Sequence, residues 1–471
     1  MQLDPAPLLL DGTPLPGPED LLEVHDPRTG ELVGRVPLCG RAEVDAALSG
    51  AAKAAPGWAR TSPGERAAAL KAAARALRAR IDEVAALQAR ETGKTAGDSL
   101  GGVEAGIGTL EQYAELGPLH RGRALQGGWD ATDVMRFEPR GVVVVLTPWN
   151  DPVAIALQGL AAALVTGNTV VYKPTERTPL CGGLVAGILA DQLPPGVLQV
   201  LHGDGRTGAL LVESPTVDAV YHVGSSATGR SIAQACARTG AHAVLEGGGK
   251  DACIVDAGVD PVWAAGQVAL GAFANAGQIC VSVERIYVHA EVAEPFVAAL
   301  VEQARARAAD AQPLVDRRQR EVVARHVEDA VAAGATALAG GAVPAGTGAH
   351  YPATVLTGCT DDMAVMREET FGPVAAVRVV ESFAEGLAAA ANSSYGLAAT
   401  VLTPDFAHAQ QAARELPVGT VKVNAVFGGA PGGAATPGRG SGQGLGYGPE
   451  LLDELTRVKV VHWEPAPGRP A

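Results

Sequence analysis

The chain has few cysteines, the residues that form the disulfides of extracellular scaffolds and bind the metal in many zinc proteins. Its six cysteines are scattered over 471 residues, with no Cys-x-x-Cys pair and no histidine at zinc-ligand spacing. This pattern excludes a small disulfide framework and contains no zinc motif. We therefore expect reduced thiols in a cytoplasmic protein and no metal site. The cysteines are Cys39, Cys181, Cys236, Cys253, Cys280 and Cys359.

The sequence also lacks an excess of positive charge and a long apolar run. Its 37 basic and 51 acidic residues give a net charge of −14, which argues against nucleic acid or an anionic membrane as partner. The longest apolar stretch, residues 153–165, contains Gln158 and is too short to span a bilayer. No basic segment followed by apolar residues opens the chain, so we expect no secretory signal.

With 471 residues, the chain is long enough for two or three domains. The capping box Ser62-Pro63-Gly64-Glu65 predicts the start of a helix that runs to about Arg90. A second helix is expected over residues 102–116. Residues 121–137 are typical of an extended, hairpin-like segment.

From Gly141 onward, short apolar runs alternate with helix-length segments, a pattern typical of a parallel sheet covered by helices on both faces. We predict a doubly wound nucleotide-binding domain. The expected strands are residues 141–146, 168–173, 197–201, 219–223 and 243–245, and the expected helices are residues 152–165, 178–191, 207–212 and 227–238.

A second α/β unit begins near Gly249. Its expected helices are residues 261–274, 294–308 and 317–333, and its expected strands include residues 374–379 and 420–424. The glycine-rich run 428–448 precedes a closing helix and strand over residues 449–463, so we interpret it as a folded loop beside a site rather than a linker.

Cys280 follows a turn of small residues and precedes a strand-like run that ends Ile286-Tyr287-Val288. A thiol in such a place can attack an electrophile when its thiolate is favoured. Cys280 is therefore the candidate nucleophile. The alternative is a buried, inert cysteine.

Two further side chains end predicted strands and suit the same chemistry. Glu246 precedes three glycines that leave its carboxylate room to move, which suits a general base, although a salt-bridged glutamate is the alternative. Asn150 ends Thr147-Pro148-Trp149-Asn150, and its amide can donate to a developing oxyanion or merely shape the turn.

A nucleotide is suggested by two other strand ends. Lys173 and Glu176 can hold a ribose, and the acid disfavours a 2′-phosphate, which favours NAD with NADP as the alternative. The segment from Gly224 to Ser231 links a strand to a helix and could meet a phosphate. It nearly matches a P-loop, but Arg230 stands where that motif has lysine, which weighs against an NTPase.

Taken together, these motifs resemble the aldehyde dehydrogenase superfamily, in its NAD(P)-dependent, non-acylating form. The resemblance covers nearly the whole chain and depends on eight motifs in the family's order. They are Pro148-Trp149-Asn150, Lys173-Pro174-Thr175-Glu176, Gly224-Ser225, Leu245-Glu246 with Gly248-Gly249-Lys250, Gly277-Gln278-Ile279-Cys280, Glu369-Thr370-Phe371-Gly372-Pro373-Val374, Asn392 with Tyr395-Gly396-Leu397, and Ser441-Gly442.

The resemblance implies a role for each matched position. Cys280 is the implied nucleophile, Glu246 the general base and Asn150 the oxyanion donor. A second group is implied to contact the cofactor, with Lys173 and Glu176 at the adenosine ribose, Ser225 at the pyrophosphate, and Glu369 with Phe371 at the nicotinamide end; Thr147 and Trp149 are assigned to the cofactor as well. Lys250 matches a motif position that we interpret as structural.

The implied fold is α/β, with a doubly wound parallel-sheet cofactor domain, a second α/β catalytic domain and a small β oligomerisation arm. Residues 1–120 and 140–248 would form the dinucleotide-binding domain, residues 249–445 the catalytic domain, and residues 121–139 and 457–471 the arm. The implied reaction oxidises a small-molecule aldehyde to the carboxylic acid through a cysteine thiohemiacetal and thioester, in a homodimer or homotetramer.

Two residues depart from the family pattern beside the expected catalytic groups. Gly247 follows the base where leucine is usual, so we expect a looser backbone at Glu246, and Asp151 follows Asn150 where an aromatic residue is common. Two alternative functions stay open. One is a catalytically silent binding protein with this fold, and the other is a CoA-acylating relative, which would not need Glu246.

Overall fold

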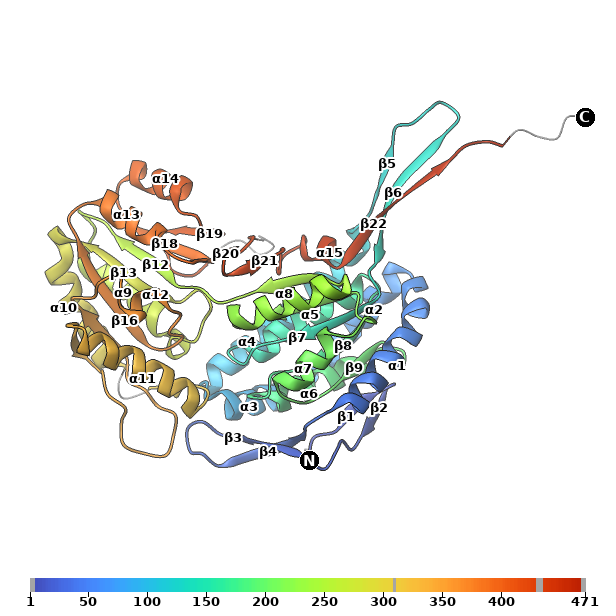
Figure 1. Ribbon diagram of the computed structural model, residues 1–471, viewed down its shortest axis with the longest axis horizontal. Coiled ribbons are helices and arrows are strands. Elements are labelled where there is room, and N and C mark those ends of the chain that lie inside the picture. Colours follow the sequence, from blue (N-terminus) through green and yellow to red (C-terminus); the bar gives the residue numbers. More distant parts are fainter. Residues whose placement is uncertain (1–4, 308–310, 429–434, 467–471) are drawn as a thin grey trace, which may run out of the picture.

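The computed structural model describes residues 5–307, 311–428 and 435–466. Two large sheets with their covering helices form the body, and a narrow three-stranded arm projects from it (Figure 1). The longer sheet is formed mostly by residues before Gly247 and the other by residues after Lys250.

The longer sheet has eight strands in the order β2-β1-β9-β8-β7-β10-β11-β21. Its central strands run parallel, while β1, β2 and β21 are added antiparallel at the edges. The strands are β1 (Leu8–Leu10), β2 (Thr13–Leu15), β7 (Val142–Leu146), β8 (Thr169–Lys173), β9 (Leu198–Val200), β10 (Ala219–Val223), β11 (His242–Glu246) and β21 (Gly442–Gln443).

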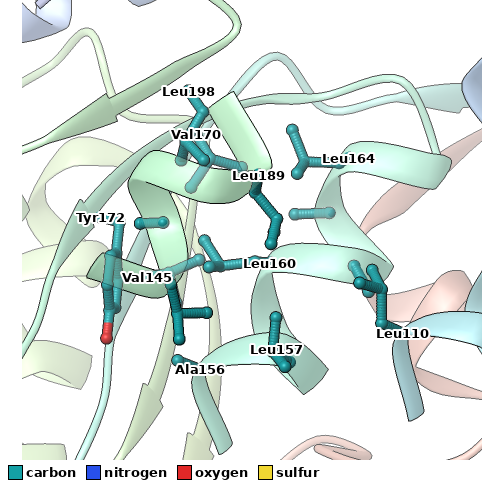
Figure 2. Packing of buried hydrophobic residues seen from close by; sticks show 14 of the residues in the cluster. Leu110, Val145, Ala156, Leu157, Leu160, Leu164, Val170, Tyr172, Leu189 and Leu198 are labelled. Atoms are coloured by element: carbon teal, nitrogen blue, oxygen red, sulfur yellow. The ribbon is translucent and has the colours of Figure 1, made fainter. Parts of the chain in front are cut away.

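Helices cover both faces of this sheet. Side chains of β7 alternate between the two cores, since Val143 and Val145 pack with one helix layer and Val142 and Val144 with the other. Figure 2 shows Leu157, Leu160 and Leu164 of the first layer at this core. The first layer contains α2 (Pro63–Ala79), α3 (Ile81–Thr92), α4 (Ala96–Leu116), α5 (Pro152–Val165) and α6 (Pro179–Ala190), and the second contains α1 (Arg41–Arg60), α7 (Gly205–Val212) and α8 (Ser226–Thr239).

The second sheet has seven strands in the order β14-β15-β16-β13-β12-β18-β19, with only β14 antiparallel. Its strands are β12 (Asp251–Val255), β13 (Val283–His289), β14 (Thr336–Ala339), β15 (Thr354–Thr357), β16 (Val374–Val380), β18 (Ala398–Leu402) and β19 (Thr420–Val423). Its helices are α9 (Pro261–Phe273) and α10 (Ala290–Ala306) on one face, and α11 (Arg317–Ala332), α12 (Ala364–Arg367), α13 (Phe383–Ala391) and α14 (Phe406–Glu415) on the other.

The arm confirms the expected hairpin. It consists of β5 (Arg123–Leu125), β6 (Thr132–Pro139) and β22 (Thr456–Trp463), with β6 antiparallel to both neighbours. The short helix α15 (Leu451–Glu454) leads into β22.

The N-terminal region differs from its prediction in two respects. The helix expected from residue 63 to about 90 is two helices, because Arg80, at φ −121° and ψ 20°, is not helical and ends α2 before α3 begins. Four strands were missed: β1, β2, β3 (Leu21–His25) and β4 (Leu32–Pro37). β1 and β2 have only three residues each, and β2 is exposed at every position, so these two carry no apolar alternation.

The glycine-rich run 428–448 is described only in part, since residues 429–434 lie outside the described residues. From Gly438 onward it folds against the body, where β20 (Gly438–Arg439) pairs with β17 (Tyr395–Gly396) and β21 pairs with β11. Within the described residues, no helix is both long and apolar enough to cross a membrane.

Candidate active site

The carboxyl ends of four adjacent parallel strands meet at one edge of the longer sheet. The register pairs Leu146 with both Lys173 and His222, and Val223 with Glu246. Therefore the turn after β7, which carries Thr147 to Asn150, lies beside Lys173, Ser225 and Glu246. Ligands of open parallel sheets bind at this edge.

The turn before Cys280 is made of backbone that most residues avoid. After α9 ends at Phe273, Asn275 and Ala276 have φ values of 50° and 53°. Gly277 follows at φ 71°, and a Cβ there would lie 2.1 Å from the Gly372 carbonyl oxygen. Left-handed non-glycine residues cost about 1–3 kcal/mol each and persist where the surroundings impose them. This turn fixes Cys280 just ahead of β13.

Asn150 is joined to this turn. Its Nδ2 donates to the Gln278 carbonyl oxygen at 3.1 Å, and its own carbonyl oxygen accepts from Asn275 Nδ2 at 3.3 Å. The amide is buried and keeps a second hydrogen. Among the described residues, the Cys280 N–H has no hydrogen-bond acceptor. Asn150 and the cysteine turn are thus brought together, with donors left over for an oxyanion.

Glu246 lies at the end of β11 and is largely buried. Burial raises the pKa of its carboxyl to about 7, although the Gly446 N–H donates to Oε1 at 2.9 Å. Gly446 must lack a side chain, because a Cβ there would be 2.3 Å from the Glu246 Cγ. The Gly446 carbonyl oxygen in turn accepts from Gln158 Nε2 at 2.6 Å. A carboxyl with a pKa near neutrality suits acid–base work.

Cys280 is partly exposed and shares this region with carboxylates. Burial, followed by the negative charges of Asp251, Glu246 and Glu369, raises the pKa of its thiol to about 12. The resting sulfur is therefore protonated, and its activation requires positive charge or loss of the proton on attack.

Glu369 and Phe371 are held by a clamp that sequence reasoning missed. The carboxylate of Glu284 accepts the Thr370 and Phe371 N–H groups, each at 2.8 Å, and pairs with the buried Lys250 ammonium. Glu369 Oε1 accepts the Gly249 N–H at 3.0 Å, and burial raises the pKa of its carboxyl to about 8. The sequence signal was the charged pair Glu284-Arg285 at the start of an otherwise largely apolar strand.

Trp149 connects the two sheets at this site. Its ring lies edge-on to Phe371 at 5.2 Å between centroids, and the Arg177 guanidinium lies over it at 5.2 Å. Arg177 also pairs with Asp316, at the start of α11, at 3.3 Å. Residues from both halves of the chain therefore enclose Trp149.

A cavity of about 500 Å³ opens beside these strand ends. Its lining includes five of the seven residues assigned to the cofactor, namely Thr147, Trp149, Lys173, Glu176 and Ser225. Glu369 and Phe371 are not in its lining; they lie against Gly249 and Trp149 instead. This volume lies within the range of about 300–1,000 Å³ typical of ligand pockets.

The polar groups of this cavity have spare hydrogen-bonding capacity. Lys173 Nζ donates to the carbonyl oxygens of Pro174 and Gly203, each at 2.9 Å, and a third hydrogen remains. Glu176 has no ion pair among the described residues. Ser225 caps α8, at the positive end of that helix.

The two residues that depart from the family pattern, Gly247 and Asp151, each interact with another part of the chain. The Gly247 N–H donates to the Ser441 carbonyl oxygen at 2.6 Å, and a Cβ at Gly247 would lie 2.8 Å from that oxygen. That Gly247 loosens the backbone at Glu246 stays a prediction. Asp151 is paired with the buried Lys94 at 3.0 Å, so its charge is balanced.

The amino-acid sequence matches a known protein family over nearly its whole length. The family model described as "Aldehyde dehydrogenase family" matches residues 16–461. The chain belongs to the aldehyde dehydrogenase family. It is thus an oxidoreductase that acts on aldehydes, and the predicted α/β fold class is confirmed by solved structures of the family.

Relatives of this aldehyde dehydrogenase are similar over nearly their full length. A betaine aldehyde dehydrogenase of Cereibacter sphaeroides is 37% identical, covering 96% of this chain and 96% of that protein. A structure of an aldehyde dehydrogenase from Bacillus cereus in complex with NAD+ is 31% identical, with a TM-score of 0.93, covering 97% and 96%. An NADP dependent enzyme of Escherichia coli is 27% identical, with a TM-score of 0.93, covering 97% and 98%.

Proposed function

We propose that the protein oxidises an aldehyde to the carboxylic acid with NAD, through a covalent intermediate on Cys280. The observation that carries this is the hydrogen bond between Asn150 Nδ2 and the Gln278 carbonyl, which ties the oxyanion donor to the cysteine turn. Glu246 lies close enough to raise the pKa of the same thiol.

The cavity residues fit a dinucleotide. Lys173 and Glu176 would hold the adenosine ribose. The remaining donor of Lys173 and the carboxylate of Glu176, which accepts one hydrogen bond from Thr175, match the ribose hydroxyls. Ser225, at the N-terminus of α8, would face the pyrophosphate. Thr147 and Trp149 line the same cavity, and Glu369 with Phe371 would hold the nicotinamide end. When bound, the oxidised nicotinamide supplies positive charge and accepts a hydride.

The first steps form a bond to sulfur. Cys280 Sγ adds to the planar aldehyde carbon and releases its proton to water, and the C=O electron pair moves to oxygen. Asn150 Nδ2 and the Cys280 N–H donate to that oxyanion. When the oxyanion reforms its C=O bond, the carbon gives up its hydrogen with both electrons, and a thioester remains on Cys280.

The second half releases the acid. Glu246 accepts a proton from water as the water oxygen adds to the thioester carbon. Collapse of this second tetrahedral species breaks the C–S bond, and the sulfur leaves as a thiol with the proton that Glu246 took from the water. Glu246 accepts a single backbone hydrogen bond, from the Gly446 N–H to Oε1, so its other carboxylate oxygen is available to that water.

The test is NADH formation with a panel of aliphatic, aromatic and amino aldehydes, betaine aldehyde included, with and without CoA. We expect turnover without CoA and a loss of about 10⁴-fold or more in Cys280→Ala. Cys253→Ala, a cysteine within β12, is the matched control and should keep its rate. No turnover with any aldehyde would favour the silent binding protein, and a strict need for CoA would favour the acylating alternative.

The preference for NAD rests on Glu176. A carboxylate beside the ribose repels a 2′-phosphate, so we expect kcat/KM to be higher with NAD than with NADP. Glu176→Gln should narrow that ratio while leaving the rate with saturating NAD nearly unchanged. A clear NADP preference in the parent protein would contradict the assignment.

We extend the proposal to the organisation of the chain. Residues 1–120 and 140–248 would bind the dinucleotide, residues 249–445 would carry the catalytic cysteine, and residues 121–139 and 457–471 would form an oligomerisation arm in a cytoplasmic homodimer or homotetramer. Exposed apolar side chains on the arm support this, with Val458, Val460 and Trp463 exposed by 54%, 60% and 63%. Light scattering after size exclusion measures the assembly.

A further inference from the structure

A second cavity, larger than the first, lies at the root of the arm. Its volume is about 710 Å³, and it is bounded by the junction of α1 with α2 and by the neighbouring ends of β6 and β22 (Figure 1). None of the residues assigned to catalysis or to the cofactor lines it. It is therefore separate from the proposed active site.

The lining of this cavity is strongly basic in a chain of net charge −14. Its described residues include one carboxylate, Glu138, which is already paired with Arg136 at 3.0 Å and Lys459 at 2.6 Å. The other arginines on the lining are Arg60, Arg66, Arg140 and Arg457, and His120 lies there as well. His120 pairs with Asp453 at 2.8 Å.

Four of these arginines have no carboxylate partner. Within the described residues, no ion pair involves Arg60, Arg66, Arg140 or Arg457. An excess of guanidinium charge at one cavity is unfavourable unless an anion balances it.

Two of the four are held in place by the backbone. Arg66 is only 8% exposed, and its Nε and Nη1 donate to the carbonyl oxygens of Val165 and Thr61 at 2.8 and 2.5 Å. Arg140 Nε donates to the Glu454 carbonyl oxygen at 2.6 Å. These bonds fix each guanidinium while its remaining N–H groups stay available. Burial lowers the pKa of both groups. At Arg140 the nearby carboxylates of Glu454 and Asp218 act in the opposite direction, and the charge of Arg457 lowers the pKa.

We propose that this cavity binds a small polyanion with two or more carboxylate or phosphate groups. Guanidinium groups pair with both kinds of oxyanion through two parallel N–H bonds, and fixed guanidiniums lose little freedom on binding. The cavity volume suits a small molecule rather than a nucleic acid. The site is independent of the proposed oxidation chemistry.

The test is calorimetric titration of the full-length protein with citrate and, separately, with pyrophosphate at constant ionic strength. Saturating NAD is present so that anions do not enter the nucleotide cavity. We expect one site per chain with a Kd of about 1 mM or tighter for at least one probe. Which probe binds more tightly distinguishes carboxylate from phosphate ligands.

The deciding variant is the double substitution Arg60→Gln/Arg457→Gln. Both side chains are exposed and unpaired, so folding should not suffer, and affinity should fall at least tenfold. Arg414→Gln, at an exposed arginine of α14, is the matched control and should bind as the parent does. Absence of saturable binding, or equal affinity in the double variant, would overturn the proposal. So would an oligomer that binds neither probe and dissociates in the double variant, because a second copy would then fill the cavity.

Discussion

Two glutamates of the candidate active site show how differently the two sheets use a carboxylate. Glu284, at the start of β13, accepts two backbone N–H groups and an ammonium, so its oxygens are fully used. Glu246, at the end of β11, accepts one backbone N–H. A carboxylate bonded on every side stabilises its surroundings, whereas one that is buried with spare capacity can exchange a proton. Whether a buried carboxylate has a structural or a catalytic role therefore depends more on its hydrogen-bond and ion-pair partners than on its burial.

Of the changes at these two glutamates, the largest effect is expected when the proton acceptor is removed. Glu246→Gln keeps the shape of the side chain but cannot take a proton from water, so kcat should fall by about 10³-fold. Because sulfur addition does not need this group, rapid mixing should still show a burst of NADH close to one equivalent per chain.

The burst separates the two halves of the reaction. Equal steady-state rates in Glu246→Gln and the parent would show that another group activates water. Loss of the burst together with the steady-state rate would place Glu246 in the first half instead.

The second effect concerns stability rather than chemistry. Glu284→Gln leaves the Lys250 ammonium buried without a counter-charge, and breaking such a pair costs about 3–5 kcal/mol. We expect a lower urea midpoint. Glu302→Gln is the control, because its pair with Arg305 is exposed and exposed pairs contribute about 1 kcal/mol or less. An unchanged midpoint in Glu284→Gln would remove the distinction drawn between the two carboxylates.

The sequence could predict one member of this comparison and not the other. Glu246 stands at the end of an apolar run before three glycines, and parallel strands bring their carboxyl ends to one edge, so its position followed from local pattern. The Lys250–Glu284 pair could not be predicted, because Lys250 precedes β12 while Glu284 lies in β13, and a pattern of residues does not give the spatial register of the two strands.

The missed contacts of Glu246 have the same origin. Gly446 lies 200 positions away in a run whose composition is also typical of linkers, and only folding shows that its N–H meets the carboxylate. The hydrogen bond from Gly247 to Ser441 likewise joins positions that are remote in sequence.

The smallest expected effect is a pH dependence. Burial places the pKa of Glu246 at about 7 instead of 4.5, so the protonated form, which cannot accept a proton, prevails below neutrality. We expect kcat to fall about tenfold per pH unit below 7 and to level off above it, measured with saturating aldehyde and NAD. The residual rate of Glu246→Gln should lack this inflection. An inflection near 4.5 in the parent would mean that water reaches the carboxylate, and Glu246 would then lose the desolvation that distinguishes it from an ordinary surface glutamate.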